Sequence, residues 1–327
     1  RLSGKRVQCL MCFRRCVVPE GARGFCRNKV NIDGRYYTLV YGKPCALQID
    51  PIEKEPVFHM LPGTKIYCIA TASCNNRCKF CHNWHISQAK PDEKIDYFVP
   101  PEEIVKEAKQ YGCKWISFTY VEPTVFFEYM LDIAKAGKDA GLRIALHTCG
   151  YINPEPLKEL LQYLDAVNVD LKGFTKSFYR KMGLGELDCV LRTIKITHES
   201  GVYLELTNLV IPNANDDIDT IKLMCKWIVN NLGKDIVLHF SRFYPAHKLT
   251  NLPPTPVSTI EKAIQVARKT GLRYVYIGNV WGHPDEDTYC PNCGRKLIDR
   301  YVYTINENHV VHGKCKYCGY KLPGIWE

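Results

Sequence analysis

Between residues 65 and 280, short apolar runs alternate with longer amphipathic stretches, and this rhythm constrains the fold more than any other feature of the chain. The apolar runs are "KIYCIATA", "KWISFTY", "LRIALHT", "DAVNVDL", "GVYLELTNLVIP", "DIVLHFSRF" and "LRYVYIG". Several stretches between them begin with Pro or Pro-Glu and end with Gly, as helices commonly do. Repeated strand–helix units predict a parallel α/β sheet, wound by right-handed crossovers into a barrel or a doubly wound sheet. A full eight-fold barrel takes about 250 residues, and this segment is shorter, so we expect a partial, TIM-like (β/α)6 barrel.

The segments on either side of this alternation have a different character. Residues 1–64 are rich in cysteine at first and then in turn-forming residues, whereas residues 286–327 contain short strand candidates flanked by C-x-x-C elements. We therefore predict three regions: a cysteine-rich N-terminal metal-binding extension (1–64), the partial barrel (65–284) and a C-terminal zinc-ribbon-like module (285–327).

Composition is that of an ordinary globular protein, with 46% hydrophobic and 24% charged residues. No apolar run approaches the roughly 18–20 residues that span a bilayer, and no signal-like segment opens the chain, which begins with Arg rather than Met. We expect no membrane role. The net charge of +10 would permit binding to nucleic acid or to an acidic protein, but without a long Lys/Arg run it favours a solvated basic surface.

Seventeen cysteines are present, and most of them fall into three tight clusters. The clusters are Cys9/Cys12/Cys16/Cys26, Cys74/Cys78/Cys81 and Cys290/Cys293/Cys315/Cys318. Such clusters indicate metal sites rather than a secreted disulfide framework, and thiolates that must stay reduced predict a cytoplasmic protein. The remaining cysteines stand singly and are expected to be small buried hydrophobes: Cys45, Cys68, Cys113, Cys149, Cys189 and Cys225.

The middle cluster has three cysteines and no fourth cysteine nearby. Cys74, Cys78 and Cys81 follow the first predicted strand, at the strand end where barrels of this kind carry their chemistry. A structural zinc site and a conventional [4Fe–4S] cluster both take four ligands. Three thiolates would instead leave one iron open to a substrate or cofactor. The alternative is a zinc site completed by a distant Cys or by a His such as His82.

The two flanking clusters each offer four thiolates. Cys290, Cys293, Cys315 and Cys318 form C-x2-C-x21-C-x2-C, in which each C-x-x-C is followed by Gly, and this pattern favours a closed structural zinc site over an auxiliary iron–sulfur cluster. Cys9, Cys12, Cys16 and Cys26 form C-x2-C-x3-C-x9-C. That spacing fits zinc or a second iron–sulfur cluster; it matches no common ferredoxin pattern, which favours zinc.

The motif C-x3-C-x-aromatic-C, here "CNNRCKFCHNW" with Phe80 as the aromatic residue, resembles that of the radical S-adenosylmethionine enzymes. The resemblance implies that the amino and carboxylate groups of S-adenosylmethionine bind the open iron of a [4Fe–4S] cluster. It implies further that an electron from the reduced cluster splits the cofactor into methionine and a 5′-deoxyadenosyl radical, which abstracts hydrogen. Phe80 would then lie at the cofactor.

The ends of later strands extend this resemblance. Glu122, in "FTYVEPT", takes the place of the acid that binds the methionine ammonium, although Tyr120 and Val121 replace the usual glycines. Asp170 and Lys172, in "NVDLKGF", resemble the D-L-K of glycyl-radical-enzyme activating enzymes, where Lys172 would pair with the cofactor carboxylate. Without the resemblance, Glu122 could be a helix-capping residue and Asp170–Lys172 a surface ion pair of about 0–1 kcal/mol. Thr148 and His239 are further candidate cofactor contacts at strand ends, with His147 beside the first, and Ser241 and Arg242 as alternatives to the second.

Taken together, segments from "GARGFC" and "IDPIEKEPVFHMLPGT" to "GKCKYCGYKLPGIW" resemble AmmeMemoRadiSam-type radical S-adenosylmethionine proteins, relatives of pyruvate formate-lyase activating enzymes. The resemblance runs nearly end to end. It implies a protein substrate and a low-potential electron donor, a ferredoxin or flavodoxin. Radical modification of RNA or of a small metabolite is the alternative enzymatic reading. A zinc-ribbon protein that binds nucleic acid or acts as a scaffold, without radical chemistry, is the alternative from another class.

Overall fold

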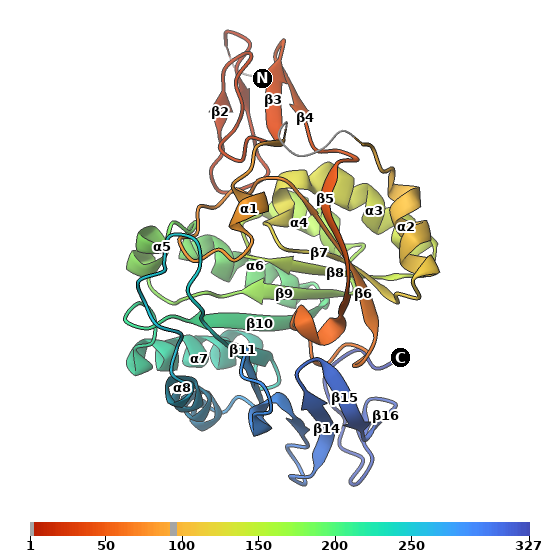
Figure 1. The fold of residues 1–327 in the computed structure, drawn as a ribbon, viewed down its shortest axis with the longest axis vertical. Helices are drawn as coiled ribbons and strands as arrows, with labels where there is room; N and C mark the ends of the chain where they lie inside the picture. The colour runs from red at the N-terminus through yellow and green to blue at the C-terminus, as the bar shows by residue number, and fades with distance from the viewer. Residues whose placement is uncertain (1–2, 92–96) are drawn as a thin grey trace.

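The computed structural model describes residues 3–91 and 97–327 and is built around an eight-stranded sheet (Figure 1). The strands, in spatial order from one edge, are β12 (Tyr274–Gly278), β11 (Val237–Arg242), β10 (Tyr203–Val210), β9 (Ala166–Asp170), β8 (Arg143–Thr148), β7 (Trp115–Phe118), β6 (Lys65–Thr71) and β5 (Pro44–Pro51). Every neighbouring pair from β6 to β12 is parallel, whereas β5 runs antiparallel to β6. The spatial order follows the chain order throughout, as in a singly wound barrel wall.

Helices connect the parallel strands and cover one face of the sheet (Figure 1). They are α2 (Pro101–Gln110), α3 (Phe127–Asp139), α4 (Pro154–Leu161), α5 (Lys176–Met182), α6 (Leu187–Glu199), α7 (Ile218–Leu232) and α8 (Val257–Thr270), with the short α1 (Trp84–Ser87) after β6. Pro101 opens α2 with Glu102 and Glu103 in its first turn, as proline geometry and the helix dipole favour. The predicted partial (β/α)6 barrel is thus confirmed, with β12 as its closing strand.

The strands of the sheet are apolar because both faces are covered. In β6 every residue after Lys65 is buried, and β7 and β9 are buried throughout. A sheet buried on both sides needs continuous apolar runs rather than alternation, which is why the sequence shows uninterrupted stretches there. Buried polar side chains such as Thr71, Thr148 and Asp170 stand at the C-terminal strand ends, whereas Ser117, Asn168 and Glu205 lie within the strands.

Two small modules flank the barrel, at opposite ends of the molecule (Figure 1). The first consists of antiparallel pairs β1 (Val7–Gln8) with β2 (Val17–Val18) and β3 (Lys29–Ile32) with β4 (Arg35–Thr38). The second contains β13 (Thr288–Tyr289), β14 (Lys296–Tyr301) and β15 (Thr304–Asn308) in one sheet, and β16 (Val310–Val311) with β17 (Lys314–Cys315) in another. Within residues 3–91 and 97–327, 3-10 turns lie at η1 (Ile52–Lys54), η3 (Pro123–Phe126) and η4 (Pro284–Glu286).

The C-terminal module packs on the barrel through its own small core. Leu297 and Ile298 on β14 are fully buried and cluster with Phe58 and Tyr276 of the barrel. The predicted boundaries at 64/65 and 284/285 stay predictions; β5, which precedes the first boundary, pairs with β6 in the central sheet. In the described part of the chain, we find no helix whose length and hydropathy would let it cross a membrane.

Candidate active site

A cavity of about 480 Å³ opens at the C-terminal ends of the parallel strands. Its lining brings together Cys74, Cys78 and Cys81 from the loop after β6 and polar groups from the ends of β7, β8 and β9. All six predicted cofactor contacts line it: Phe80, Glu122, Thr148, Asp170, Lys172 and His239. Residues separated by more than a hundred positions thus meet at one site, because parallel strands end at the same edge.

The loop that carries the three cysteines is held against the end of α5. The backbone N–H groups of Arg77 and Lys79 donate to the carbonyl oxygens of Gly183 and Met182, each at 3.0 Å. Gly183 has φ +72°, and a Cβ atom there would stand 2.3 Å from the Arg77 oxygen. Only glycine fits this close approach, so Gly183 determines the path of the loop although it contributes no side chain.

The three thiols suit a cluster better than a single ion. Burial raises the pKa of Cys74 to about 12, and burial likewise raises the pKa of Cys78 and Cys81. Cys74 is buried and Cys78 and Cys81 are partly buried, so in the thiolate form they would need a compensating cation, which a metal centre would provide. Their sulfur atoms do not all lie within 4.8 Å of one another, and neither they nor His82 belong to any tight ligand group in the described residues. Wide separation is expected for thiolates that bind different irons of one cluster.

Glu122 lies beside this loop, fixed by four hydrogen bonds. Its backbone N–H donates to the Cys74 sulfur at 3.4 Å. Its carboxylate accepts from the hydroxyl of Thr148 (2.7 Å), the hydroxyl of Thr124 (2.8 Å) and the backbone N–H of Cys149 (2.8 Å). Burial raises the pKa of Glu122, although these bonds oppose the shift. The side chain is 2% exposed and faces the cavity, so it is not a solvent-exposed helix cap.

Tyr120 adopts the backbone conformation for which glycine would usually be needed before this acid. Its backbone has φ +63°, the left-handed conformation that glycine adopts freely and tyrosine does not. The Tyr120 hydroxyl donates to Asp50 at 2.6 Å, and Asn83 donates to its carbonyl oxygen at 3.0 Å. These contacts compensate for the unfavourable backbone, so the same turn is built without glycine.

A chain of charges crosses the floor of the cavity. Lys172 Nζ lies 2.7 Å from Asp170, whose other oxygen is 3.3 Å from His147; His147 in turn lies 3.4 Å from Glu55. Burial opposes ionisation of Asp170, but Lys172 and His147 outweigh it and hold its pKa below the ordinary value. Burial also disfavours protonated His147, yet Asp170 and Glu55 raise the pKa of His147 to about 10. Asp170 is buried and Lys172 is partly buried, and both line the cavity, so they do not form a fully exposed surface ion pair.

His147 is accordingly expected to contribute pH-dependent stability. Its pKa rises from 6.5 to about 10 on folding, so its contribution is complete below about pH 6.5 and is lost as the pH rises through about 10. In urea unfolding, the wild type should exceed His147→Gln in stability most at pH 6.5 and least at pH 10. His198→Gln, on the exposed face of α6, is the matched control. A gap that widens with pH would contradict the assignment.

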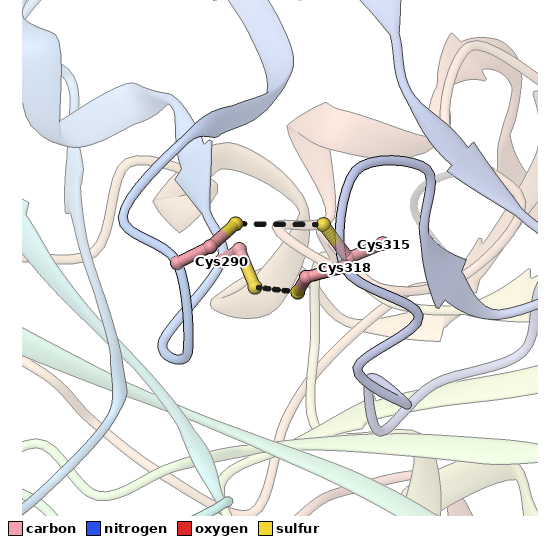
Figure 2. Close-up of side chains that lie close together, drawn as sticks. Cys290, Cys315 and Cys318 are labelled. Carbon is pink, nitrogen blue, oxygen red and sulfur yellow. Dashed lines mark hydrogen bonds between the residues drawn. The ribbon is translucent and has the colours of Figure 1, made fainter.

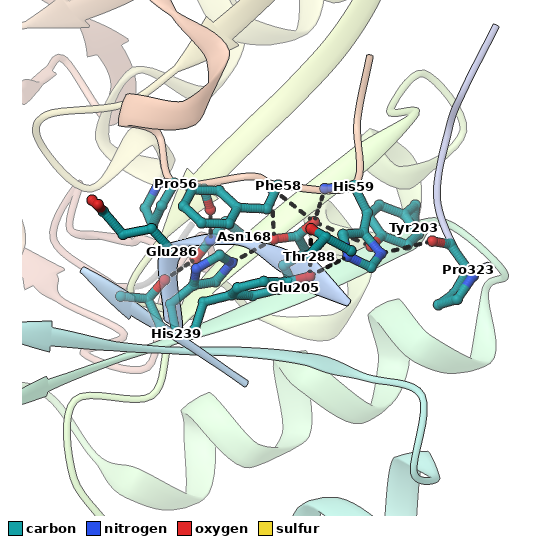
Figure 3. Close-up of polar contacts among 12 residues, drawn as sticks. Pro56, Phe58, His59, Asn168, Tyr203, Glu205, His239, Glu286, Thr288 and Pro323 are labelled. Atoms are coloured by element: carbon teal, nitrogen blue, oxygen red, sulfur yellow. Dashed lines mark hydrogen bonds and ion pairs between the residues drawn. The ribbon is translucent and has the colours of Figure 1, made fainter. Parts of the chain in front are cut away.

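His239 occupies a different setting from the other candidates (Figure 3). It is fully buried on β11, and its Nε2 lies 2.6 Å from the Glu205 carboxylate. Its ring stacks on Tyr276 and meets Phe58 edge-on. Among the described residues its Nδ1 has no hydrogen-bond partner, so that atom is left for a ligand. A cofactor contact by His239 stays a prediction.

The four C-terminal cysteines come together as a tetrahedral site requires (Figure 2). The sulfurs of Cys290 and Cys318 are 3.6 Å apart, and those of Cys293 and Cys315 are 3.8 Å apart. Tetrahedral zinc with Zn–S bonds of about 2.3 Å places its sulfurs about 3.8 Å apart. The geometry fits a zinc-ribbon-like module that could hold one metal ion.

The N-terminal cysteines also converge, though less tightly. The backbone N–H of Cys9 donates to the carbonyl oxygen of Cys16 at 2.9 Å, and burial raises the pKa of Cys9, Cys12 and Cys26. In the part of the chain that the structure describes, only the C-terminal set has all its ligand atoms within 4.8 Å. Which metal the N-terminal cysteines hold, zinc or an iron–sulfur cluster, stays a prediction.

Sequence reasoning missed several residues of the site. Cys149 follows the end of β8, and the strand-end position that pointed to Thr148 and His147 was the signal available for it. Tyr120 was noted only as a departure from a motif. Glu55 offered no signal, because it follows a 3-10 turn and meets His147 only through the tertiary fold.

Comparisons with known proteins agree with this site. The sequence family described as the Radical SAM superfamily matches residues 68–224. An uncharacterized protein of Methanocaldococcus jannaschii is 47% identical over 98% of this chain and 96% of its own length. The pyruvate formate-lyase-activating enzyme of Clostridium pasteurianum is 23% identical over 48% of this chain and 66% of that enzyme.

A solved structure supports the same fold. The crystal structure of Streptococcus suis SuiB bound to S-adenosylmethionine matches with a TM-score of 0.54 and 13% identity, over 73% of this chain and 56% of that chain. At that identity the likeness shows a shared fold. The sequence matches favour an enzyme over a nucleic-acid-binding scaffold. On the strength of the family match and the activating-enzyme relatives, this chain belongs to the radical S-adenosylmethionine superfamily of enzymes.

Proposed function

We propose that the chain binds a [4Fe–4S] cluster through Cys74, Cys78 and Cys81, cleaves S-adenosylmethionine reductively and abstracts hydrogen from a protein substrate. The observation that carries the proposal is the convergence, around one cavity, of the three-thiol loop, the buried Glu122 and the Asp170–Lys172 pair. Each group comes from a different strand end. A scaffold protein would have no need to bury these charges together, since buried charge is costly.

Different residues of the chain would bind the cluster and the cofactor. The three cysteines would hold three irons and leave the fourth to the amino and carboxylate groups of the cofactor. Glu122, already fixed by Thr148 and by the Cys149 N–H, would accept a hydrogen bond from the cofactor ammonium. Lys172 would pair with the cofactor carboxylate, and Asp170 would keep Lys172 in place. When bound, the cluster supplies the electron that splits the cofactor into methionine and a 5′-deoxyadenosyl radical.

A protein substrate is supported by the names of several relatives. They include a 4-hydroxyphenylacetate decarboxylase activating enzyme of Clostridium scatologenes and pyruvate formate-lyase-activating enzymes. The cavity is bordered by the exposed Trp281 and by Tyr303, aromatic surface of the kind that protein interfaces favour. A low-potential ferredoxin or flavodoxin would supply electrons. We further propose zinc at the C-terminal site and a cytoplasmic location; no described cysteine forms a disulfide.

The test is anaerobic turnover of the reconstituted protein with dithionite and S-adenosylmethionine, measuring 5′-deoxyadenosine by chromatography. The wild type should form it, and a Cys74/Cys78/Cys81→Ala variant should not. Zinc rather than iron in the three-cysteine loop would overturn the proposal. Label transferred from isotopic cofactor mainly into RNA would contradict the protein substrate.

Glu122→Gln provides a graded version of the same test. Loss of one charge-assisted hydrogen bond costs about 1.5–3 kcal/mol, or roughly a 10- to 150-fold increase in the Kd of S-adenosylmethionine. Equilibrium binding to the oxidised, cluster-loaded protein would measure it. Glu102→Gln, exposed in the first turn of α2, is the matched control and should bind as the wild type does. An unchanged Kd for Glu122→Gln would remove this residue from the cofactor site.

A further inference from the structure

We propose that the cavity binds a cationic side chain of the protein substrate, a lysine or an arginine, at Glu53 and Glu286. The inference deepens the proposed function by naming the chemical class of the substrate residue, and it rests on that function for what happens to the bound residue. Binding itself can be measured without any radical chemistry. Three features of the cavity carry the inference: buried acids without an ion pair, an unpartnered carboxylate oxygen, and aromatic residues in the same wall.

Two of the carboxylates that line the cavity have no basic partner in an ion pair. Every other lining acid has such a partner or a proposed role at the cofactor: Asp50, Glu55, Glu122 and Asp170. Glu53 and Glu286 form no ion pair within the described part of the chain, although they are only 1% and 4% exposed. A buried carboxylate without a counter-ion is costly, so a positively charged ligand would stabilise this arrangement.

Glu53, in η1, has a carboxylate oxygen that nothing else in the described chain satisfies. Its Oε1 accepts from the backbone N–H of Gly63 at 2.8 Å, whereas its Oε2 has no hydrogen-bond partner among residues 3–91 and 97–327. Asn76 Oδ1 and His239 Nδ1 are likewise unpartnered at the cavity, but Asn76 lies in the three-cysteine loop and His239 is a predicted cofactor contact. Glu53 has no such role at the cofactor. A ligand with several N–H donors would satisfy its free oxygen.

Arg300 acts on Glu53 electrostatically but does not bond to it. Its guanidinium donates to the carbonyl oxygens of Glu286 (3.1 Å) and Phe58 (2.8 Å) and to the Thr288 hydroxyl (2.7 Å). Burial raises the pKa of Glu53, and Arg300 opposes this shift only in part. Burial raises the pKa of Glu286 in the same way. An ammonium or guanidinium group beside the two acids would stabilise their ionised forms.

The C-terminal part of the chain supplies Glu286 and two aromatic residues of the same wall. Glu286 ends η4, and its carboxylate accepts from the backbone N–H of Gly282 at 2.8 Å. Trp281 lines the cavity and is 66% exposed, and Tyr303 lines it from the turn between β14 and β15. Aromatic rings attract cations through their π faces. A wall that combines an acid with such rings suits a cationic side chain better than an anionic or purely apolar one.

The same acids disfavour a substrate rich in phosphate. Two carboxylates without ion pairs would repel the backbone of an RNA, whose binding depends on neutralising its phosphates. A lysine or arginine of a protein would instead be attracted. The charge of Glu53 and Glu286 therefore supports a protein substrate over the RNA alternative.

Peptide binding to the cluster-loaded protein tests the inference. The probes are end-blocked glycine pentapeptides whose central residue is lysine, arginine or the uncharged norleucine. Calorimetric titration in the presence of S-adenosylmethionine should give a Kd about 10- to 150-fold lower for a charged peptide than for the norleucine peptide, as one charge-assisted hydrogen bond would produce. A preference for only one of the charged peptides would identify the side chain. Equal Kd values for all three, or no measurable binding of either charged peptide, would overturn the inference.

Variants assign the binding to the two acids. Glu53→Gln and Glu286→Gln should each raise the Kd of the preferred peptide about 10- to 150-fold and leave that of the norleucine peptide unchanged. Glu53→Asp, which keeps the charge, should retain the preference for a charged peptide. Glu102→Gln, exposed on α2, is the control and should behave as the wild type. Wild-type peptide binding by both glutamine variants would contradict the assignment, as would a loss of affinity for S-adenosylmethionine in Glu53→Gln.

Failure of this inference can be distinguished from failure of the proposed function. A protein that prefers the charged peptides but forms no 5′-deoxyadenosine would contradict the radical chemistry and leave the cationic site standing. A protein that forms 5′-deoxyadenosine but shows no preference for charge would contradict the site and leave the radical chemistry standing.

Discussion

Glu205→Leu is expected to lower the free energy of unfolding by about 3–5 kcal/mol, because it removes one partner of a buried ionic network. Figure 3 shows the carboxylate at the centre of this network. It accepts from the backbone N–H groups of Phe58 (3.1 Å) and His59 (2.9 Å), from the Tyr203 hydroxyl (3.1 Å) and from His239 (2.6 Å). Burial opposes its ionisation, but His239 and His59 lower the pKa of Glu205. Leucine would leave all four donors unpaired.

The network joins parts of the fold that are far apart in sequence. His59 bonds through one ring nitrogen to the Tyr276 hydroxyl (2.6 Å) and through the other to the Pro323 carbonyl oxygen (2.9 Å). Arg300 of β14 donates to the Phe58 carbonyl oxygen at 2.8 Å and stacks on its ring. Phe58 and His59 are therefore held between the barrel and the C-terminal module. Loss of the Glu205 network should destabilise both.

Urea unfolding of the metal-loaded protein, followed by circular dichroism, would measure the effect. Glu205→Gln, which keeps the shape and some hydrogen bonds, should fall between Glu205→Leu and the wild type. Glu261→Gln, which breaks the His283 ion pair at the surface, should cost less than about 1 kcal/mol. If Glu205→Leu stayed within 1 kcal/mol of the wild type, the network would be dispensable.

Removing the C-terminal metal site, with Cys293→Ser/Cys318→Ser, is expected to unfold residues 285–327 while the barrel stays folded. The module has only a small core of its own, built on Leu297 and Ile298. Zinc contributes an apparent 10–16 kcal/mol or so to folding in zinc-finger peptides, far more than such a core can replace. Limited proteolysis should cut the variant within 285–327, and metal analysis should show loss of one zinc with iron retained.

The same variant should also impair turnover. Val302 and Tyr303, between β14 and β15, line the catalytic cavity, so an unfolded module would open that wall to solvent. Deoxyadenosine formation with substrate should fall, whereas Cys113→Ser should match the wild type in both assays. A protease-resistant, fully active double variant would show that the metal is not required for the module's structure.

The strand–helix rhythm, the three-cysteine loop and the acid after the second barrel strand were open to sequence reasoning because each depends on local features. Apolar period, helix start signals and cysteine spacing act over a few residues, and parallel strands necessarily bring their ends to one edge. Glu122, Asp170 and Lys172, which line the cavity, could be identified from the family resemblance together with their strand-end positions.

The remaining features of the site depend on contacts between residues that are distant in sequence, so only the tertiary structure could determine them. The protonation of His147 arises from Glu55 and Asp170, and the anchoring of His59 arises from Glu205, Tyr276 and Pro323. No local pattern encodes these pairings. Likewise, the spacing of Cys9, Cys12, Cys16 and Cys26 was compatible with two metals, and only the structure shows that this segment meets the three-cysteine loop, where Arg77 donates to the carbonyl oxygen of Phe25. Sequence determined which residues are candidates to bind metal and cofactor; the folded chain decided which of them lie close together.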